Sequence, residues 1–213
     1  MIALNPRKLD AACDWRVLAL CIVFCGMFYG AVMGMYFEIG GPRALQMLYS
    51  ALKVPMLLGV TFVITIPSFF VINTLLGLRG DFAESIRALM ATQAILAVVL
   101  ASFAPFTALW YASSASYDGA QLFNLMMFGL ASFAAQFWLR KMYRPLIARS
   151  PRHRTMLGAW LMVYAFVGVQ MAWVLRPFIG APNHPTQFFR EDAWSNAYVV
   201  VFRLLWRAVR GDC

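Results

Sequence analysis

Charged residues are missing from five long stretches of this chain, and acidic residues are scarce throughout it. Of 213 residues, 13% are charged, and 9 Asp and Glu stand against 18 Lys and Arg. A soluble domain carries roughly 25% charged residues, and a helix at its surface repeats polar residues along one face. This chain has about half that charged fraction, and its long uncharged stretches have no such polar face, which together exclude an ordinary soluble protein. The uncharged stretches are 17–37, 54–78, 88–111, 120–139 and 155–175.

Each uncharged stretch reaches the length of about 20 residues that crosses a bilayer as an α-helix. We therefore predict an all-α fold, a polytopic integral membrane helical bundle of about five transmembrane helices. Because no part of the chain is long enough for a separate soluble domain, residues 1–213 should form a single transmembrane domain. The lack of charge at membrane depth also disfavours pumps, proton relays and voltage sensors, which need ionisable groups there.

Histidine and catalytic motifs are equally scarce. The two histidines, His153 and His184, fall in loops on opposite sides of the predicted bundle, which excludes a bis-histidine haem within the membrane. The sequence has no G-x-S-x-G, H-E-x-x-H or phosphate-binding loop, and no paired carboxylates in an apolar segment. We expect no catalytic residues, no metal and no cofactor.

Basic residues concentrate between the fourth and fifth stretches, in a segment without acids. The positive-inside rule places residues 140–154 in the cytoplasm. With five spans the N-terminus shares that side, and the C-terminal tail lies on the opposite one. Because this topology explains the net charge of +9, we expect no nucleic-acid partner. Such cations attract anionic lipid headgroups, and the predicted headgroup contacts are Arg140, Lys141, Arg144, Arg149, Arg152 and Arg154.

Two segments have the amphipathic pattern of helices that lie on a membrane surface. In residues 44–53, Leu45, Leu48 and Leu52 repeat at helical spacing. Residues 193–210 place aromatic and aliphatic side chains on one face and arginines on another. We predict an interfacial helix in each segment. A sixth short span is the alternative for 193–210.

Glycine and proline mark special positions inside the spans. Gly26, Gly30 and Gly34 lie on one face of the first span, where the missing side chains let two helix backbones approach closely. We predict close helix packing there, with a span of the same chain favoured over another subunit. Pro67 and Pro105 predict kinks in the second and third spans. Such kinks are mostly structural, although transporters build midplane sites at them.

Amides are the main polar side chains within the spans. Their usual role in membranes is interhelical hydrogen bonding, and the alternative role is the lining of a polar pathway. The candidate lining residues are Asn73, Gln93, Asn124, Gln136 and Gln170.

A loop rich in proline and phenylalanine, 176–192, follows the fifth span. Its aromatic side chains favour burial, so we predict a structured loop that folds onto the membrane domain. The loop serves either as a cap or as a partner-docking surface. The candidate docking residues are Arg176, Phe178, Phe188, Phe189 and Arg190.

The central part of the chain carries a pattern of short motifs. Lys53-Val-Pro opens a span that reads TFVITIPS over 61–68 and closes with NTLLG over 73–77. The polar step GDFAESIR over 80–87 leads to a span that contains Pro105. Over about residues 50–175 the chain resembles the Yip family, the Ypt/Rab-interacting five-span membrane proteins. The resemblance implies a small, non-catalytic helical membrane protein with a cytoplasmic N-terminus.

Three functions fit these features. The first is a non-catalytic scaffold or accessory subunit of a larger membrane assembly, which contacts the lipid bilayer and a membrane-protein partner or a second copy of itself. The alternative is a small transporter or channel with a site near Pro67 and Pro105. A membrane enzyme acting on a lipid through Asp81, Glu84 and the basic segment is the third, but the sequence offers it no metal or nucleophile set.

Overall fold

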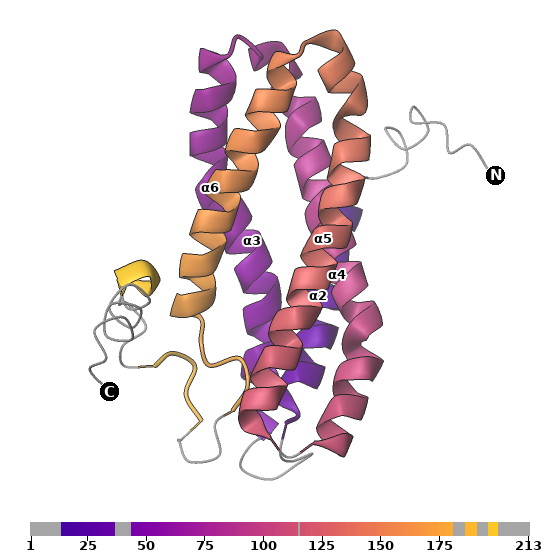
Figure 1. The fold of residues 1–213 in the computed structure, drawn as a ribbon, viewed down its shortest axis with the longest axis vertical. Coiled ribbons are helices and arrows are strands. Elements are labelled where there is room, and N and C mark those ends of the chain that lie inside the picture. The colour runs from indigo at the N-terminus through magenta and orange to yellow at the C-terminus, as the bar shows by residue number, and fades with distance from the viewer. Residues whose placement is uncertain (1–13, 37–43, 115, 181–185, 191–195, 200–213) are drawn as a thin grey trace, which may run out of the picture.

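The computed structural model describes residues 14–36, 44–114, 116–180, 186–190 and 196–199. In this part of the chain five helices are long and apolar enough to cross a membrane, which confirms the predicted all-α, multi-span architecture (Figure 1). A short 3₁₀ helix, η2 (Arg79–Asp81), joins the second and third of them. The five are α2 (Trp15–Gly34), α3 (Ala44–Leu75), α4 (Phe82–Ser113), α5 (Tyr117–Arg149) and α6 (Arg152–Val174).

Local signals set several helix ends. The Asp14 carboxylate accepts a hydrogen bond from the Arg16 amide at the start of α2, and the Ser116 hydroxyl accepts one from the Gly119 amide at the start of α5. Both are N-caps that satisfy free helix donors. After α3 the chain turns at Gly77, whose φ of 72° is the left-handed conformation that glycine adopts most easily. This turn leads through η2 into α4.

The helices differ in length. At a rise of 1.5 Å per residue, the 20 residues of α2 span about 30 Å, which matches the hydrocarbon core of a bilayer. The 32 or 33 residues of α3, α4 and α5 span about 48–50 Å. Because α2 packs beside the N-terminal part of α3 (Figure 1), the longer helices continue past it toward η2.

The interfacial helix predicted over 44–53 is not a separate element, because these residues form the first turns of α3. The apolar face of this segment is exposed, including Leu45, Leu48 and Leu52, whereas its polar side chains are buried. This inverted pattern arises because the polar side chains bind a loop and the backbone contacts α2. The second predicted interfacial helix, 193–210, lies outside the described residues except for 196–199.

Two apolar cores follow one another along the bundle. The α2 core combines α2, α3, α4 and α5 with the loop residues Phe178 and Ile179, around the buried Tyr29 and Leu100. The α6 core lies toward η2 and combines α3, α4, α5 and α6 around Phe69, Tyr143 and Trp160. Helices α3, α4 and α5 therefore contribute to both cores, whereas α2 and α6 each contribute to one.

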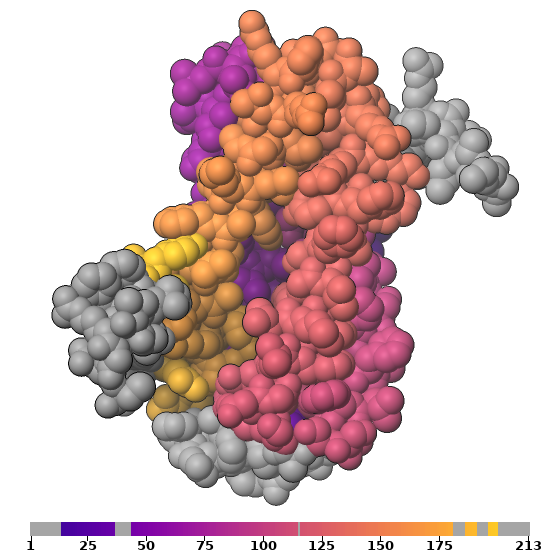
Figure 2. All heavy atoms as spheres, in the orientation of Figure 1, coloured from indigo at the N-terminus to yellow at the C-terminus, as the bar shows by residue number. Residues whose placement is uncertain are grey.

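The bundle is open on one side. Helices α5 and α6 meet at the turn after Arg149 and diverge from it, with α5 packed on α4 and α6 on α3 (Figure 1). Figure 2 shows a hollow between the two helices, at the bottom of which deeper helices are visible. Helix α6 also exposes Met162, Phe166 and Val169. The outer surface of α6 is therefore apolar.

Pro67 lies inside α3 and Pro105 lies inside α4, and both helices continue past these prolines without interruption.

Candidate functional site

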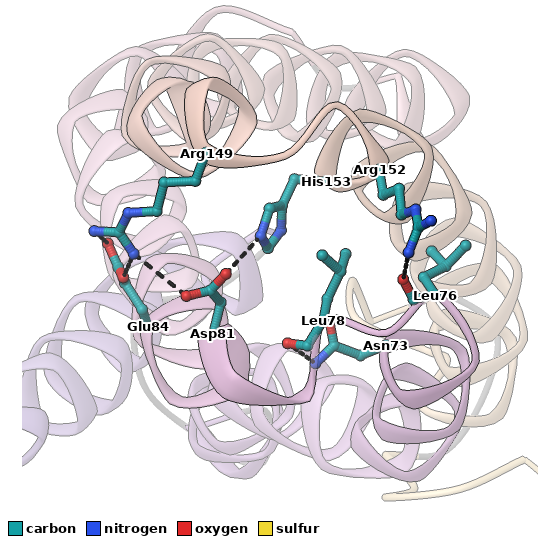
Figure 3. Close-up of polar contacts among 8 residues, drawn as sticks. All are labelled: Asn73, Leu76, Leu78, Asp81, Glu84, Arg149, Arg152 and His153. Atoms are coloured by element: carbon teal, nitrogen blue, oxygen red, sulfur yellow. Dashed lines mark hydrogen bonds and ion pairs between the residues drawn. The ribbon is translucent and has the colours of Figure 1, made fainter.

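Charged side chains meet at the end of the bundle formed by η2, the start of α4 and the turn between α5 and α6 (Figure 3). We call Asp81, Glu84, Arg149 and His153 the η2-end cluster. The Arg149 guanidinium donates to Glu84 Oε2 at 2.6 Å and to Asp81 Oδ1 at 3.3 Å. His153 Nε2 lies 3.0 Å from the other Asp81 oxygen. Asp81 thereby ties α5 and α6 to the start of α4.

Burial differs sharply within the η2-end cluster. The side chain of His153 is fully buried, whereas those of Asp81 and Arg149 are 31% and 55% exposed. Arg149 lies beyond the uncharged stretch of α5 and forms its ion pairs with Glu84 and Asp81 there. The stability contribution of an exposed ion pair is small because water and salt screen it. We therefore expect the buried His153 to contribute more to stability than Arg149.

Replacement of His153 by alanine should lower the free energy of unfolding by about 2–5 kcal/mol, as large-to-small changes of buried side chains do. Arg149→Met should produce a much smaller change. Thermal unfolding of both variants in the same detergent measures the difference. An equal loss of stability in the two would show that the ion pairs, and not burial, hold this end together.

Two arginines predicted to contact lipid headgroups also have partners in the chain and remain exposed. Arg149 bonds to Glu84 and Asp81, and Arg152 donates to the Leu76 carbonyl at 3.2 Å. The partners lie 65 or more residues away in sequence, so the local charge pattern did not identify them. Arg154 is exposed, as are Arg140, Lys141 and Arg144.

A second polar site lies at the opposite end, where the loop after α6 is bound to the first turns of α3. Lys53 Nζ donates to the Pro177 carbonyl at 2.6 Å. The Phe178 carbonyl accepts hydrogen bonds from the Ser50 hydroxyl and, at 3.3 Å, from the Gln46 amide. The donors Gln46, Ser50 and Lys53 are buried. We call these contacts the loop latch.

Aromatic contacts extend the loop latch. The Phe188 ring lies 5.0 Å from Lys53 Nζ and packs edge-on against Tyr49. A cation over an aromatic face is attracted by the negative charge density of the ring. Phe178 packs against the α2 core. The loop thus covers the end of the core as a cap.

The candidate docking residues of the loop divide into two groups. Phe178 and Phe188 face the protein, and the Arg176 guanidinium lies 3.3 Å from the centre of the Trp173 ring. Arg190 is half-buried, while Phe189 is 40% exposed. Phe189 packs edge-on against Phe188 and is the most exposed aromatic residue of this set.

The polar amides do not converge on one cavity. Asn124 accepts from the Tyr29 hydroxyl at 3.0 Å and donates to the Tyr111 hydroxyl at 2.6 Å, which joins α2, α4 and α5. The remaining four lie elsewhere in the bundle. Gln93 accepts from Tyr164, Gln170 accepts from the Ala197 amide, Asn73 donates to the Leu78 carbonyl, and Gln136 Oε1 is buried without a hydrogen-bond partner in the described residues.

The glycine stripe of α2 faces α3. A methyl group at Gly30 would overlap the Ser50 carbonyl oxygen and lie 2.9 Å from Ala51 Cα, and one at Gly34 would lie 2.7 Å from Met47 Cα. A methyl group at Gly26 would lie 3.3 Å from the Pro55 nitrogen. The three glycines therefore allow close contact between two helices of the same chain.

The loop latch was not predicted from the sequence. Lys53 stands at the edge of an uncharged stretch, where a lysine usually marks the membrane interface. One signal was available, since Gln46, Ser50 and Lys53 repeat at the spacing of one helix face. The carbonyls that they bind lie more than 120 residues away.

Comparisons with protein-family models, with curated proteins and with solved structures find no match to this chain. The fold itself defines the class of protein, a multi-span helical membrane protein. It has five apolar helices of membrane-spanning length, with polar side chains gathered at both ends of the bundle.

Proposed function

We propose that this chain is a non-catalytic integral membrane protein that acts as a scaffold or accessory subunit of a larger membrane assembly, as its resemblance to the Yip family implies. The observation that best supports this proposal is that polar side chains inside the bundle form hydrogen bonds to other parts of the same chain. Asn124 joins three helices, Gln93 binds Tyr164, and Lys53 binds the Pro177 carbonyl. These groups hold the protein together and are not free to line a pathway.

The surfaces that remain fit an interaction role. The loop latch fixes one end of the bundle, and the η2-end cluster fixes the other, so both ends offer ordered surfaces. The latched loop presents the exposed ring of Phe189, and large aromatic side chains often dominate the binding energy of an interface. We place the η2 end in the cytoplasm because residues 140–154 are rich in Arg and Lys.

The test is purification of the tagged chain from native membranes in mild detergent, followed by quantitative mass spectrometry. We expect a membrane protein at a fixed molar ratio, reduced at least fivefold by Phe189→Ser. The matched control is Gln187→Ser, an exposed position two residues away, which should retain the partner. A monodisperse particle of this chain alone in all three samples would contradict the subunit proposal.

One observation favours the second candidate, a small transporter or channel. Gln136 Oε1 is buried and has no hydrogen-bond partner in the described residues, and the hollow between α5 and α6 opens the bundle on one side. A transporter would conduct when reconstituted alone in liposomes, and Gln136→Leu would reduce its solute flux. The scaffold proposal expects no flux from the isolated chain.

A further inference from the structure

We propose that a recess on α5, lined by Phe137, Arg140, Lys141 and Arg144, binds an anionic phospholipid of the adjoining leaflet. The three cations hold the headgroup phosphate, and an acyl chain lies along the apolar face of α5 below them. This inference goes beyond the proposed function and does not depend on it, because it concerns a lipid and not a protein partner.

The recess lies at the level expected of lipid headgroups. Its volume is about 410 Å³, and its four lining residues lie on one side of α5 at helical spacing. Arg140 directly follows Leu139, the last residue of the uncharged stretch, so the recess lies where the apolar part of the helix ends. Lys141 Nζ lies 4.9 Å from the centre of the Trp138 ring, and tryptophan is typical of the headgroup level.

The charge of the recess is not neutralised within the described chain. Arg140, Lys141 and Arg144 are exposed. The ion pairs among the described residues involve Arg149 and His153 with Asp81 and Glu84, and none involves these three cations. Positive charge is therefore free at this recess, whereas Arg149 shares its charge with two carboxylates. An anion is the complementary ligand.

The apolar face of α5 favours a lipid over a free anion. Leu130, Phe133 and Phe137 are 49%, 75% and 68% exposed, and they lie below the cations on the same side of the helix. This stripe continues into the recess through Phe137, whose side chain lines it. A phosphate ion would use only the cations. A phospholipid uses the cations and the stripe together.

The experiment is native mass spectrometry of the full chain in detergent, with dioleoyl phosphatidylglycerol or dioleoyl phosphatidylcholine added at equal concentration. We expect wild type to retain at least fivefold more phosphatidylglycerol than phosphatidylcholine. Arg140→Gln/Lys141→Gln/Arg144→Gln should abolish the preference. The matched control Arg16→Gln/Arg79→Gln/Arg154→Gln removes the same charge at three exposed arginines outside the recess and should keep it.

Single variants provide a second comparison in case either triple variant fails to fold. The single variants Arg144→Gln and Arg154→Gln both replace exposed arginines, and only the first should lower phosphatidylglycerol retention. Phe137→Ala should lower it while the cations remain. Equal losses in the two triple variants, or in the two single variants, would overturn the proposal in favour of diffuse electrostatic attraction. Displacement of phosphatidylglycerol by inorganic phosphate at the same concentration would overturn the lipid as the occupant.

Discussion

Replacement of Gly30 by alanine is expected to separate α2 from α3 and to destabilise the protein. The added methyl group would overlap the Ser50 carbonyl oxygen and press on Ala51 Cα. Both are backbone atoms, which cannot move aside without moving α3. Overpacking of this kind costs about 1–3 kcal/mol and occasionally more, and Gly30→Leu should cost more than Gly30→Ala. Thermal unfolding of the purified variants in detergent measures the loss.

Two other glycines supply a matched control for Gly30. A methyl group at Gly59 in α3 or at Gly129 in α5 would meet no atom within 4 Å. In a helix interior, alanine is favoured over glycine by about 1 kcal/mol, so Gly59→Ala and Gly129→Ala should match or exceed wild type in stability. A Gly30→Ala protein as stable as these controls would show that α2 and α3 do not pack closely at this position.

Replacement of Lys53 by glutamate is expected to release the loop latch. A carboxylate would replace the ammonium group beside the carbonyl oxygen of Pro177, where like partial charges repel. Lys53→Met keeps the apolar stem but leaves that carbonyl without its donor, at a cost of about 1–3 kcal/mol. Lys53→Glu should have the larger effect, because it removes the donor and also places an acceptor against the Pro177 carbonyl oxygen.

Hydrogen exchange at the amides of Phe178, Ile179 and Gly180 measures the release. We expect exchange at least tenfold faster in Lys53→Glu, with Lys53→Met between it and wild type. Lys141→Met is the control, because Lys141 is exposed and far from the loop in sequence. Unchanged exchange in Lys53→Glu would mean that the Lys53 hydrogen bond does not hold the loop.

The spans were predictable because hydropathy is a local property. A run without charge identifies a membrane helix by itself, and each of the five uncharged stretches falls largely within one of the helices. Helix ends were less predictable, as residues 44–53 show. Leu45, Leu48 and Leu52 suggested an apolar face against the membrane surface, but the segment continues α3 because Gln46, Ser50 and Lys53 are buried beneath the loop.

The polar contacts were the least predictable part of the candidate site. Arg149 looks like an ordinary basic residue at a span end, and its carboxylate partners precede it by 65 and 68 residues. Nothing in the local sequence marks such pairs. The glycine stripe was more informative, since spacing alone indicated which face of α2 approaches another helix. Spacing alone could not identify Ser50 and Ala51 of α3 as the residues that this face of α2 contacts.

The loop latch has a consequence for the order of assembly during synthesis. Helices α2 and α3 can associate as soon as both have left the ribosome. Lys53, however, must wait for the Pro177 carbonyl, which is synthesised 124 residues later. At about 5–20 residues per second, that interval is roughly 6–25 seconds. The nascent chain therefore carries an unpartnered lysine in α3 during that interval, and the α2 core is complete only after Phe178 and Ile179 have been synthesised.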